Sequence, residues 1–302
     1  MNNRRIAVAA VVLLSLFALS LHAQTQQQML IQPTPQTRQQ LTKTLQEYRA
    51  NKDRHGEAVT LLQLGLTEAG LGNVSGARSN LAEAVEKMRA QSDHVGTWMA
   101  LLVLSQIEVA AGRPAEALPH VERALTTLNE AKSSTAPFSL KTLMALGAVS
   151  GLPPEMSQLL EGPNAGAIKP LMIQYSLEPM THDLYGSVLT EVGQLEKAEA
   201  ELKAAAAGAI YAQGMYDFSI ESHFGDLRFR QQRYDEARTH YVKALNASST
   251  AATMLPMGGG QQIQAGLYDR LVRLETVTGH PEEAKRWSQK ARELGRKRPE
   301  TR

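Results

Sequence analysis

The chain has 302 residues, a formal net charge of +2 at pH 7, 5% aromatic residues and no cysteine. The near-neutral balance excludes a dedicated nucleic-acid or anionic-membrane binder, because such proteins need a large excess of positive charge to displace counterions from phosphate. Without cysteine the chain has no disulfide framework and no lipid-modified N-terminal cysteine, and its abundant Ala and Leu favour closely packed helices over a β-sandwich.

The first 23 residues have the pattern of a secretory signal peptide. Two arginines precede an apolar stretch over residues 6–21, and Ala23 is a small residue suited to cleavage before Gln24. An uncleaved membrane anchor is the alternative, but this stretch falls short of the roughly 20 residues that a spanning helix needs. We therefore expect export to a periplasmic or secreted location, with no stable membrane span after cleavage.

The next segment, residues 24–36, is rich in Gln and Pro and shows no helical pattern, so we expect a flexible leader. After it Leu41, Leu45 and Tyr48 recur at helical spacing, which predicts an amphipathic helix over residues 37–52. We expect this helix to cap the N-terminal end of the structure that follows.

A short turn motif then recurs: a Gly, two to four mostly polar residues and an Ala. Copies begin at Gly72, Gly112, Gly193 and Gly279, and a fifth has Gln232 in place of Gly. In most copies a larger residue lies four positions after this Ala, and in all five a second Ala lies three positions further on. Gly is expected to end the first helix of a hairpin, and the small residues let two helices approach closely.

The copies recur at a long period. The turn Ala residues are 40, 81, 39 and 47 positions apart. Because 81 is twice the usual interval, we expect a degenerate third copy around residues 143–160. This gives about six repeats within residues 37–296, followed by a basic tail over residues 297–302.

This pattern resembles the tetratricopeptide repeat, a helix-turn-helix unit of about 34 residues. The longer period and the missing terminal Pro make the chain more similar to arrays of kinesin light chain or bacterial type. The resemblance implies an all-α, right-handed α-solenoid of stacked helix-turn-helix repeats. It also implies a concave groove, lined by the first helices, that binds a protein or peptide partner.

Aligning the copies assigns groove-facing positions, which are mostly polar in the C-terminal repeats. In the first repeat the equivalent residues are apolar: Val59, Leu62 and Leu66. They either extend the groove or lie beneath the helix over residues 37–52 as part of the core. The remaining groove positions are Met99, Gln106, Asp183, Ser187, Glu191, Ser222, Asp226, Arg230, Asp269 and Arg273.

Catalytic and cofactor-binding patterns are missing from the sequence. The eight His residues form no HExxH pair and have no Cys ligands beside them, and no Gly-x-Ser-x-Gly motif occurs. We therefore expect no enzymatic activity, no metal and no cofactor. The basic run near the C-terminus is either a solvated helix end or a contact for an acidic partner or lipid headgroup.

Three functions remain open. The favoured one is a protein-binding scaffold in the bacterial cell envelope. The alternative is an oligomeric structural component of an envelope assembly, which would self-associate. An enzyme acting on envelope polymers is third, and it would need carboxylates that converge in one cleft.

Overall fold

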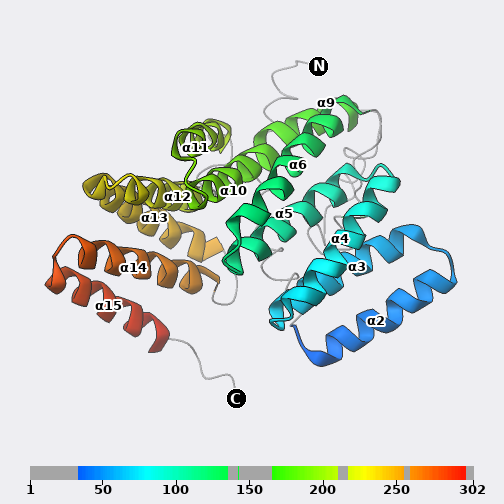
Figure 1. Cartoon of the computed structure of the whole chain (residues 1–302), viewed down its shortest axis with the longest axis horizontal. Helices are drawn as coiled ribbons and strands as arrows, with labels where there is room; N and C mark the ends of the chain where they lie inside the picture. The colour runs from blue at the N-terminus through cyan, green and yellow to red at the C-terminus, as the bar shows by residue number, and fades with distance from the viewer. Residues whose placement is uncertain (1–32, 135–141, 143–164, 210–216, 255–258, 297–302) are drawn as a thin grey trace. The chain divides into compact units, whose positions relative to one another are not determined.

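The computed structural model describes residues 33–134, 142, 165–209, 217–254 and 259–296, and every regular element in these ranges is a helix (Figure 1). The predicted signal peptide, most of the leader and the degenerate third repeat lie outside the described residues. The elements are α2 (Pro35–Ala50), α3 (Arg54–Gly70), α4 (Val74–Ala90), α5 (His94–Ala110), α6 (Pro114–Ser133), α9 (Ala165–Met172), the π-helix η1 (Ile173–Leu177), α10 (Glu178–Glu191), α11 (Leu195–Ala209), α12 (Asp217–Arg230), α13 (Tyr234–Met254), α14 (Gly259–Val277) and α15 (Pro281–Arg296).

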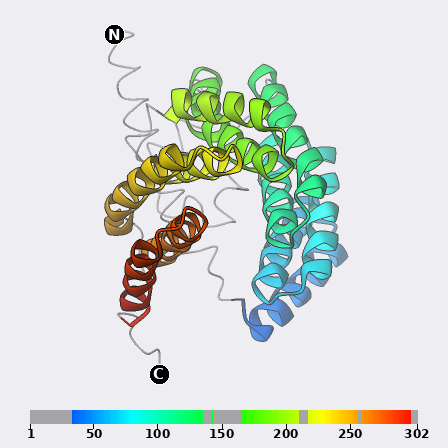
Figure 2. The ribbon, with the colours of Figure 1, turned by 60° about the vertical axis from the view of Figure 1, so that its left-hand side comes forward.

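The chain divides into two compact units, Met1–Thr181 and His182–Arg302, called here the N-terminal and C-terminal units. The boundary falls within α10. In each unit, helices that are joined by a short turn pack side by side as antiparallel hairpins, which Figure 2 shows from a second direction. The predicted all-α repeat fold is therefore confirmed.

The first helix begins earlier than the sequence pattern predicted. α2 spans Pro35–Ala50, whereas we expected residues 37–52. Thr34 accepts a hydrogen bond from the Thr37 backbone N–H at 3.1 Å, and Pro35 occupies the first helical position. A hydroxyl at the N-cap and a Pro just inside the helix are strong start signals. The hydroxyl accepts a hydrogen bond from a first-turn N–H that lacks a helical partner, and Pro has no N–H that would need one.

The helices α3 to α6 start at evenly spaced positions, Arg54, Val74, His94 and Pro114. Three of these starts share one cap, an Asx side chain that accepts the backbone N–H of a Gly three positions later. The caps are Asp53 on Gly56, Asn73 on Gly76 and Asp93 on Gly96, at 2.9, 3.1 and 2.9 Å. The turn that joins two hairpins is thus built like the turn inside a hairpin.

The residue before each cap has a left-handed backbone conformation. Four of these turn residues are Gly72, Gly112, Gly193 and Gly279, with φ between 73° and 81°. Lys52, Ser92 and Gln232 adopt the same conformation, with φ between 54° and 60°. The Gly of the motif has the predicted role, and three residues with side chains fill the same role at a modest conformational cost.

Within a hairpin the first helix leaves a gap that a large side chain of the second helix fills. A Cβ placed on Gly65 would lie 2.4 Å from Leu81 Cγ, and one on Gly186 would lie 2.6 Å from Leu202 Cγ. Tyr241 fills the same gap beside Gly225. All three pairs have the same separation in the sequence, so the close approach is a repeated feature of the fold.

A buried charge lies four positions before the turn residue on several first helices. Three of these charges form an ion pair with a residue on the second helix of the preceding hairpin, the residue that directly follows the turn Ala. In two of the pairs the first helix carries the Glu and the second helix the Arg; in the pair of Glu199 and Arg228 the two are exchanged. The pairs are Arg78 with Glu108 at 2.6 Å, Glu199 with Arg228 at 2.9 Å, and Arg238 with Glu275 at 2.7 Å.

The hairpin gap leads to a first prediction. Gly65→Ala should destabilise the protein by about 1–3 kcal/mol, because the added methyl overpacks the contact with Leu81. Gly266→Ala is the matched control: its Cβ would meet only Arg270 Nη1, at 3.6 Å, so it should be neutral or stabilising by up to about 1 kcal/mol. Urea unfolding measures the stability of both variants. Equal effects of the two substitutions would contradict the claim that close packing against Leu81 requires Gly at position 65.

The partly buried pair of Arg238 and Glu275, with side chains 31% and 3% exposed, leads to a second prediction. Hydrogen bonding from Arg238 lowers the pKa of Glu275, so the pair stabilises the fold above the ordinary carboxyl pKa and loses that contribution as the pH falls. Arg238→Met should cost on the order of 3 kcal/mol at pH 7, whereas Arg238→Met with Glu275→Leu should cost much less.

Urea unfolding at pH 7 and at pH 4 separates the two contributions. The cost of Arg238→Met should shrink at the lower pH, because Glu275 is then partly protonated. If Arg238→Met with Glu275→Leu is as unstable as Arg238→Met alone, then Arg238 stabilises the fold by something other than its ion pair with Glu275.

Candidate partner-binding face

The first helices of the C-terminal unit, α10, α12 and α14, carry eight of the nine polar residues predicted to line a groove. Counting back from the turn residues Gly193, Gln232 and Gly279 places them in three rows. We call these nine positions the first-helix face. The row ten positions back is Asp183, Ser222 and Asp269; the row six back is Ser187, Asp226 and Arg273; the row two back is Glu191, Arg230 and Val277.

Asp183 is a buried residue that links α10 to α12. Its carboxylate accepts a hydrogen bond from Ser219 Oγ at 2.5 Å and contacts His223 Nδ1 at 2.7 Å. Burial lowers the pKa of His223, but the charge of Asp183, its hydrogen bond and the charge of Asp226 outweigh burial and raise this pKa above its usual value. Asp183 therefore holds two neighbouring side chains in place.

The Ser219, Asp183 and His223 cluster is not arranged for nucleophilic catalysis. In a hydrolytic triad the His lies between the nucleophile and the carboxylate, where it removes the nucleophile's proton. Here the carboxylate lies between the other two, and the Ser hydroxyl donates to it. The cluster therefore has the geometry of a helix-to-helix contact.

Asp226 connects three helices at the centre of the face. It accepts hydrogen bonds from Tyr241 Oη at 2.9 Å and from Arg270 Nε at 2.9 Å, so it joins α12 to α13 and α14. Burial first, and then the charge of Asp226, raise the pKa of Tyr241 above its usual value. The phenol consequently stays protonated and keeps donating.

The outer part of the face carries exposed charges. Glu191 and Arg230 form an ion pair of 2.6 Å with side chains 40% and 43% exposed. Asp269 and Arg273 are exposed, and the Arg273 guanidinium lies 4.5 Å from the centre of the Phe229 ring. In the same row as the ion pair, Val277 is 54% exposed and is the one large apolar side chain exposed among the described residues.

Predicted groove positions in the N-terminal unit behave differently. Gln106 is exposed, whereas Met99 is buried. Val59 and Leu62 are 5% and 0% exposed, and α2 packs against α3, which carries them. For these two residues the core alternative holds, so they offer no surface to a partner.

Sequence reasoning missed the residues that hold the face together. His223 and Arg270 both lie nine positions before their turn residue, directly after the predicted groove positions Ser222 and Asp269. From there they reach a carboxylate on the preceding first helix. The recurrence of a basic side chain at this one repeat position was the available signal.

In the described part of the chain, no group of three or more His, Asp or Glu residues is placed to hold a metal ion. Among the same residues no helix combines the length and the apolar character that crossing a bilayer requires.

The comparisons with known proteins agree with the fold. Residues 36–130 match the tetratricopeptide repeat family. The crystal structure of BtubC (BKLC) from P. vanneervenii is similar over 85% of this chain and 89% of that one, with 14% identity and a TM-score of 0.54. The assembly chaperone of RpL4, Acl4, shares 17% identity over 86% of this chain and 97% of its own, with a TM-score of 0.46.

No curated protein sequence matches the chain. At such low identity the structural likeness to BtubC shows the fold alone. The resemblance to tetratricopeptide repeat proteins is confirmed for residues 36–130, whereas the longer period of about 40 residues stays a prediction.

The raised pKa of His223 leads to a third prediction. A raised folded pKa stabilises the fold below the ordinary His pKa of about 6.5 and loses that contribution as the pH rises through the folded value. The stability lost in His223→Gln should therefore be larger at pH 6 than at pH 9, as measured by urea unfolding. Asp183→Asn is the control: burial then outweighs the remaining charge of Asp226 and lowers the pKa of His223, so in its background the pH dependence of the His223 effect should reverse.

Proposed function

We propose that this protein is an exported, non-catalytic scaffold of the bacterial cell envelope that binds a protein or peptide partner on the first-helix face of its C-terminal unit. The observation that carries the proposal is the division of that face. Its inner carboxylates are engaged with neighbouring helices, whereas Glu191, Arg230, Asp269 and Arg273 are exposed. A set of exposed charges on a framework with fixed side chains suits recognition.

The chemistry of the exposed residues indicates the kind of partner. Acidic and basic side chains alternate, with one exposed apolar residue, Val277, at the edge of α14. A peptide that carries both charges and an apolar residue opposite Val277 would match this surface. Because exposed ion pairs contribute little energy, the charges would mainly set orientation and association rate, and affinity would need apolar burial as well.

Export is supported by the N-terminal pattern alone. The positive start, the apolar stretch and the small residue at Ala23 together suit cleavage by a signal peptidase. A scaffold released in this way would meet its partner outside the cytoplasm.

A capture experiment tests the face. The full chain with Glu191→Ala, Arg230→Ala and Asp269→Ala should lose a partner that the parent retains from envelope extract. The changed side chains are exposed, so stability should change by less than about 1 kcal/mol. The matched control removes exposed charges from second helices, through Lys197→Ala, Lys243→Ala and Lys285→Ala, and should keep the partner.

The result is compared with sedimentation of the purified parent. If both variants retain the partner, the first-helix face is not the binding surface. If the parent captures only further copies of itself, the oligomeric structural function replaces the scaffold.

Fractionation of expressing cells tests export. The protein should appear in the periplasm or medium with Gln24 as its first residue, as determined by mass spectrometry of the intact chain. Recovery in the membrane fraction with residues 1–23 still attached would instead establish an uncleaved anchor.

A further inference from the structure

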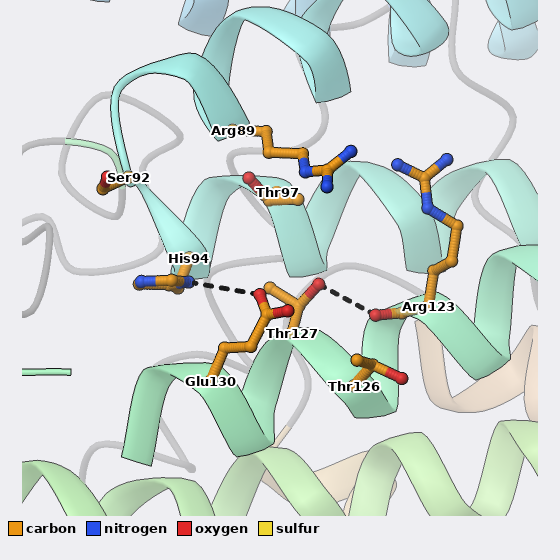
Figure 3. Close-up of a pocket in the computed structure, with 8 residues that line it drawn as sticks. All are labelled: Arg89, Ser92, His94, Thr97, Arg123, Thr126, Thr127 and Glu130. Atoms are coloured by element: carbon orange, nitrogen blue, oxygen red, sulfur yellow. Dashed lines mark hydrogen bonds and ion pairs between the residues drawn. The ribbon is translucent and has the colours of Figure 1, made fainter. Parts of the chain in front are cut away.

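A cavity of about 370 Å³, lined by polar and charged residues, lies between α4, α5 and α6 in the N-terminal unit (Figure 3). Its volume falls in the range of small-molecule sites, roughly 300–1,000 Å³. None of its residues belongs to the first-helix face, so the proposed function does not account for it. The lining residues are Arg89, Ser92, His94, Thr97, Arg123, Thr126, Thr127 and Glu130.

One side of the cavity presents two guanidinium groups. Arg89 is exposed at the end of α4, and among the described residues no carboxylate is in ion-pair contact with it. Arg123 approaches Glu86 only at 3.6 Å, with side chains 47% and 66% exposed, which is a weak pair. Both groups therefore keep N–H donors for a ligand, and paired arginines favour a carboxylate.

The middle of the cavity offers acceptors. The hydroxyls of Thr97, Thr126 and Thr127 donate to the backbone oxygens of Asp93, Glu122 and Arg123, at 2.7, 3.0 and 2.8 Å. A hydroxyl has one proton, so each of these oxygens can only accept a hydrogen bond from a ligand. This part of the cavity suits N–H groups.

The other side of the cavity is acidic. Glu130 is 61% exposed and lies 4.0 Å from His94 Nδ1. Figure 3 shows this pair on the opposite side of Thr127 from the two guanidinium groups. A ligand that is only an anion would use the arginines but would be repelled by Glu130, and it would leave the threonine oxygens without donors.

We propose that this cavity binds a short zwitterionic peptide of about two residues. Its carboxylate would lie on Arg89 and Arg123, its amide N–H on the threonine oxygens and its ammonium group on Glu130. Arg123 and Glu130 are two helical turns apart on α6, which corresponds to about 10 Å along the helix axis. An extended dipeptide spans about 7 Å, and a hydrogen bond of about 3 Å at each end brings the total to about 13 Å. The ligand would therefore lie oblique to α6, with its carboxylate towards Arg89 on α4.

Calorimetric titration of the full chain with dialanine tests the proposal. Dialanine should bind with a Kd below about 1 mM. N-acetyl-dialanine, which lacks the ammonium group, and dialanine amide, which lacks the carboxylate, should each bind at least about tenfold more weakly. Inorganic phosphate should bind more weakly than dialanine.

Variants assign the two ends of the ligand. Arg89→Gln with Arg123→Gln should weaken dialanine at least about tenfold, and Glu130→Gln should abolish the preference for dialanine over its N-acetyl form. Lys285→Gln with Arg292→Gln removes two exposed cations elsewhere and should leave binding unchanged.

Three results would overturn the proposal: no heat of binding with dialanine, equal binding of the acetylated peptide, or phosphate binding as tight as that of dialanine. Any of them would leave Arg89 as a cation that only complements the end of its helix. The variants used for partner capture do not alter this cavity, so the two proposals fail independently.

Discussion

The fold depends on the contact between a Gly of the first helix and a large side chain of the second helix in the same hairpin. Because a Cβ on Gly65 would lie 2.4 Å from Leu81 Cγ, the two backbones are closer than ordinary side chains allow. In the C-terminal unit the large residue is Tyr241, which fills the gap beside Gly225 and carries its hydroxyl to Asp226. Hairpin packing and the order of the first-helix face therefore rest on the same side chain.

The sequence predicts the hairpins well because the turn motif combines two local requirements, a residue that accepts a left-handed conformation and a small residue that follows it. It does not predict the turns after α2 and α4, where Lys52 and Ser92 adopt that conformation without being Gly. The sequence pattern that indicates those turns is an Asp followed three positions later by a Gly, as at Asp53 and Gly56 and again at Asp93 and Gly96. A capping pattern is harder to recognise than a Gly because Asp and Asn occur in many other settings.

The candidate site could be predicted only in part. Repeat alignment places residues on the correct helices and rows, because side-chain direction follows helical periodicity. It does not show which neighbouring side chain reaches across, so Asp183 and Asp226 looked like exposed groove residues although they hold α10, α12, α13 and α14 together. The cavity beside Arg89 could not be anticipated, because its residues come from three helices and the turn at Ser92 and do not form a recognisable binding motif.

The reversed polarity of the Glu199 and Arg228 pair has a consequence for how the array was assembled. A hairpin copied from the region of Arg78 or Arg238 and inserted before α12 would face Arg228 with a second arginine. Such a duplication would place two like charges at a partly buried contact and would be disfavoured unless both changed together. The hairpins resemble one another in shape, but the charges at their contacts differ. These charges restrict which hairpin can stand next to which, and so they limit rearrangement of the array by recombination.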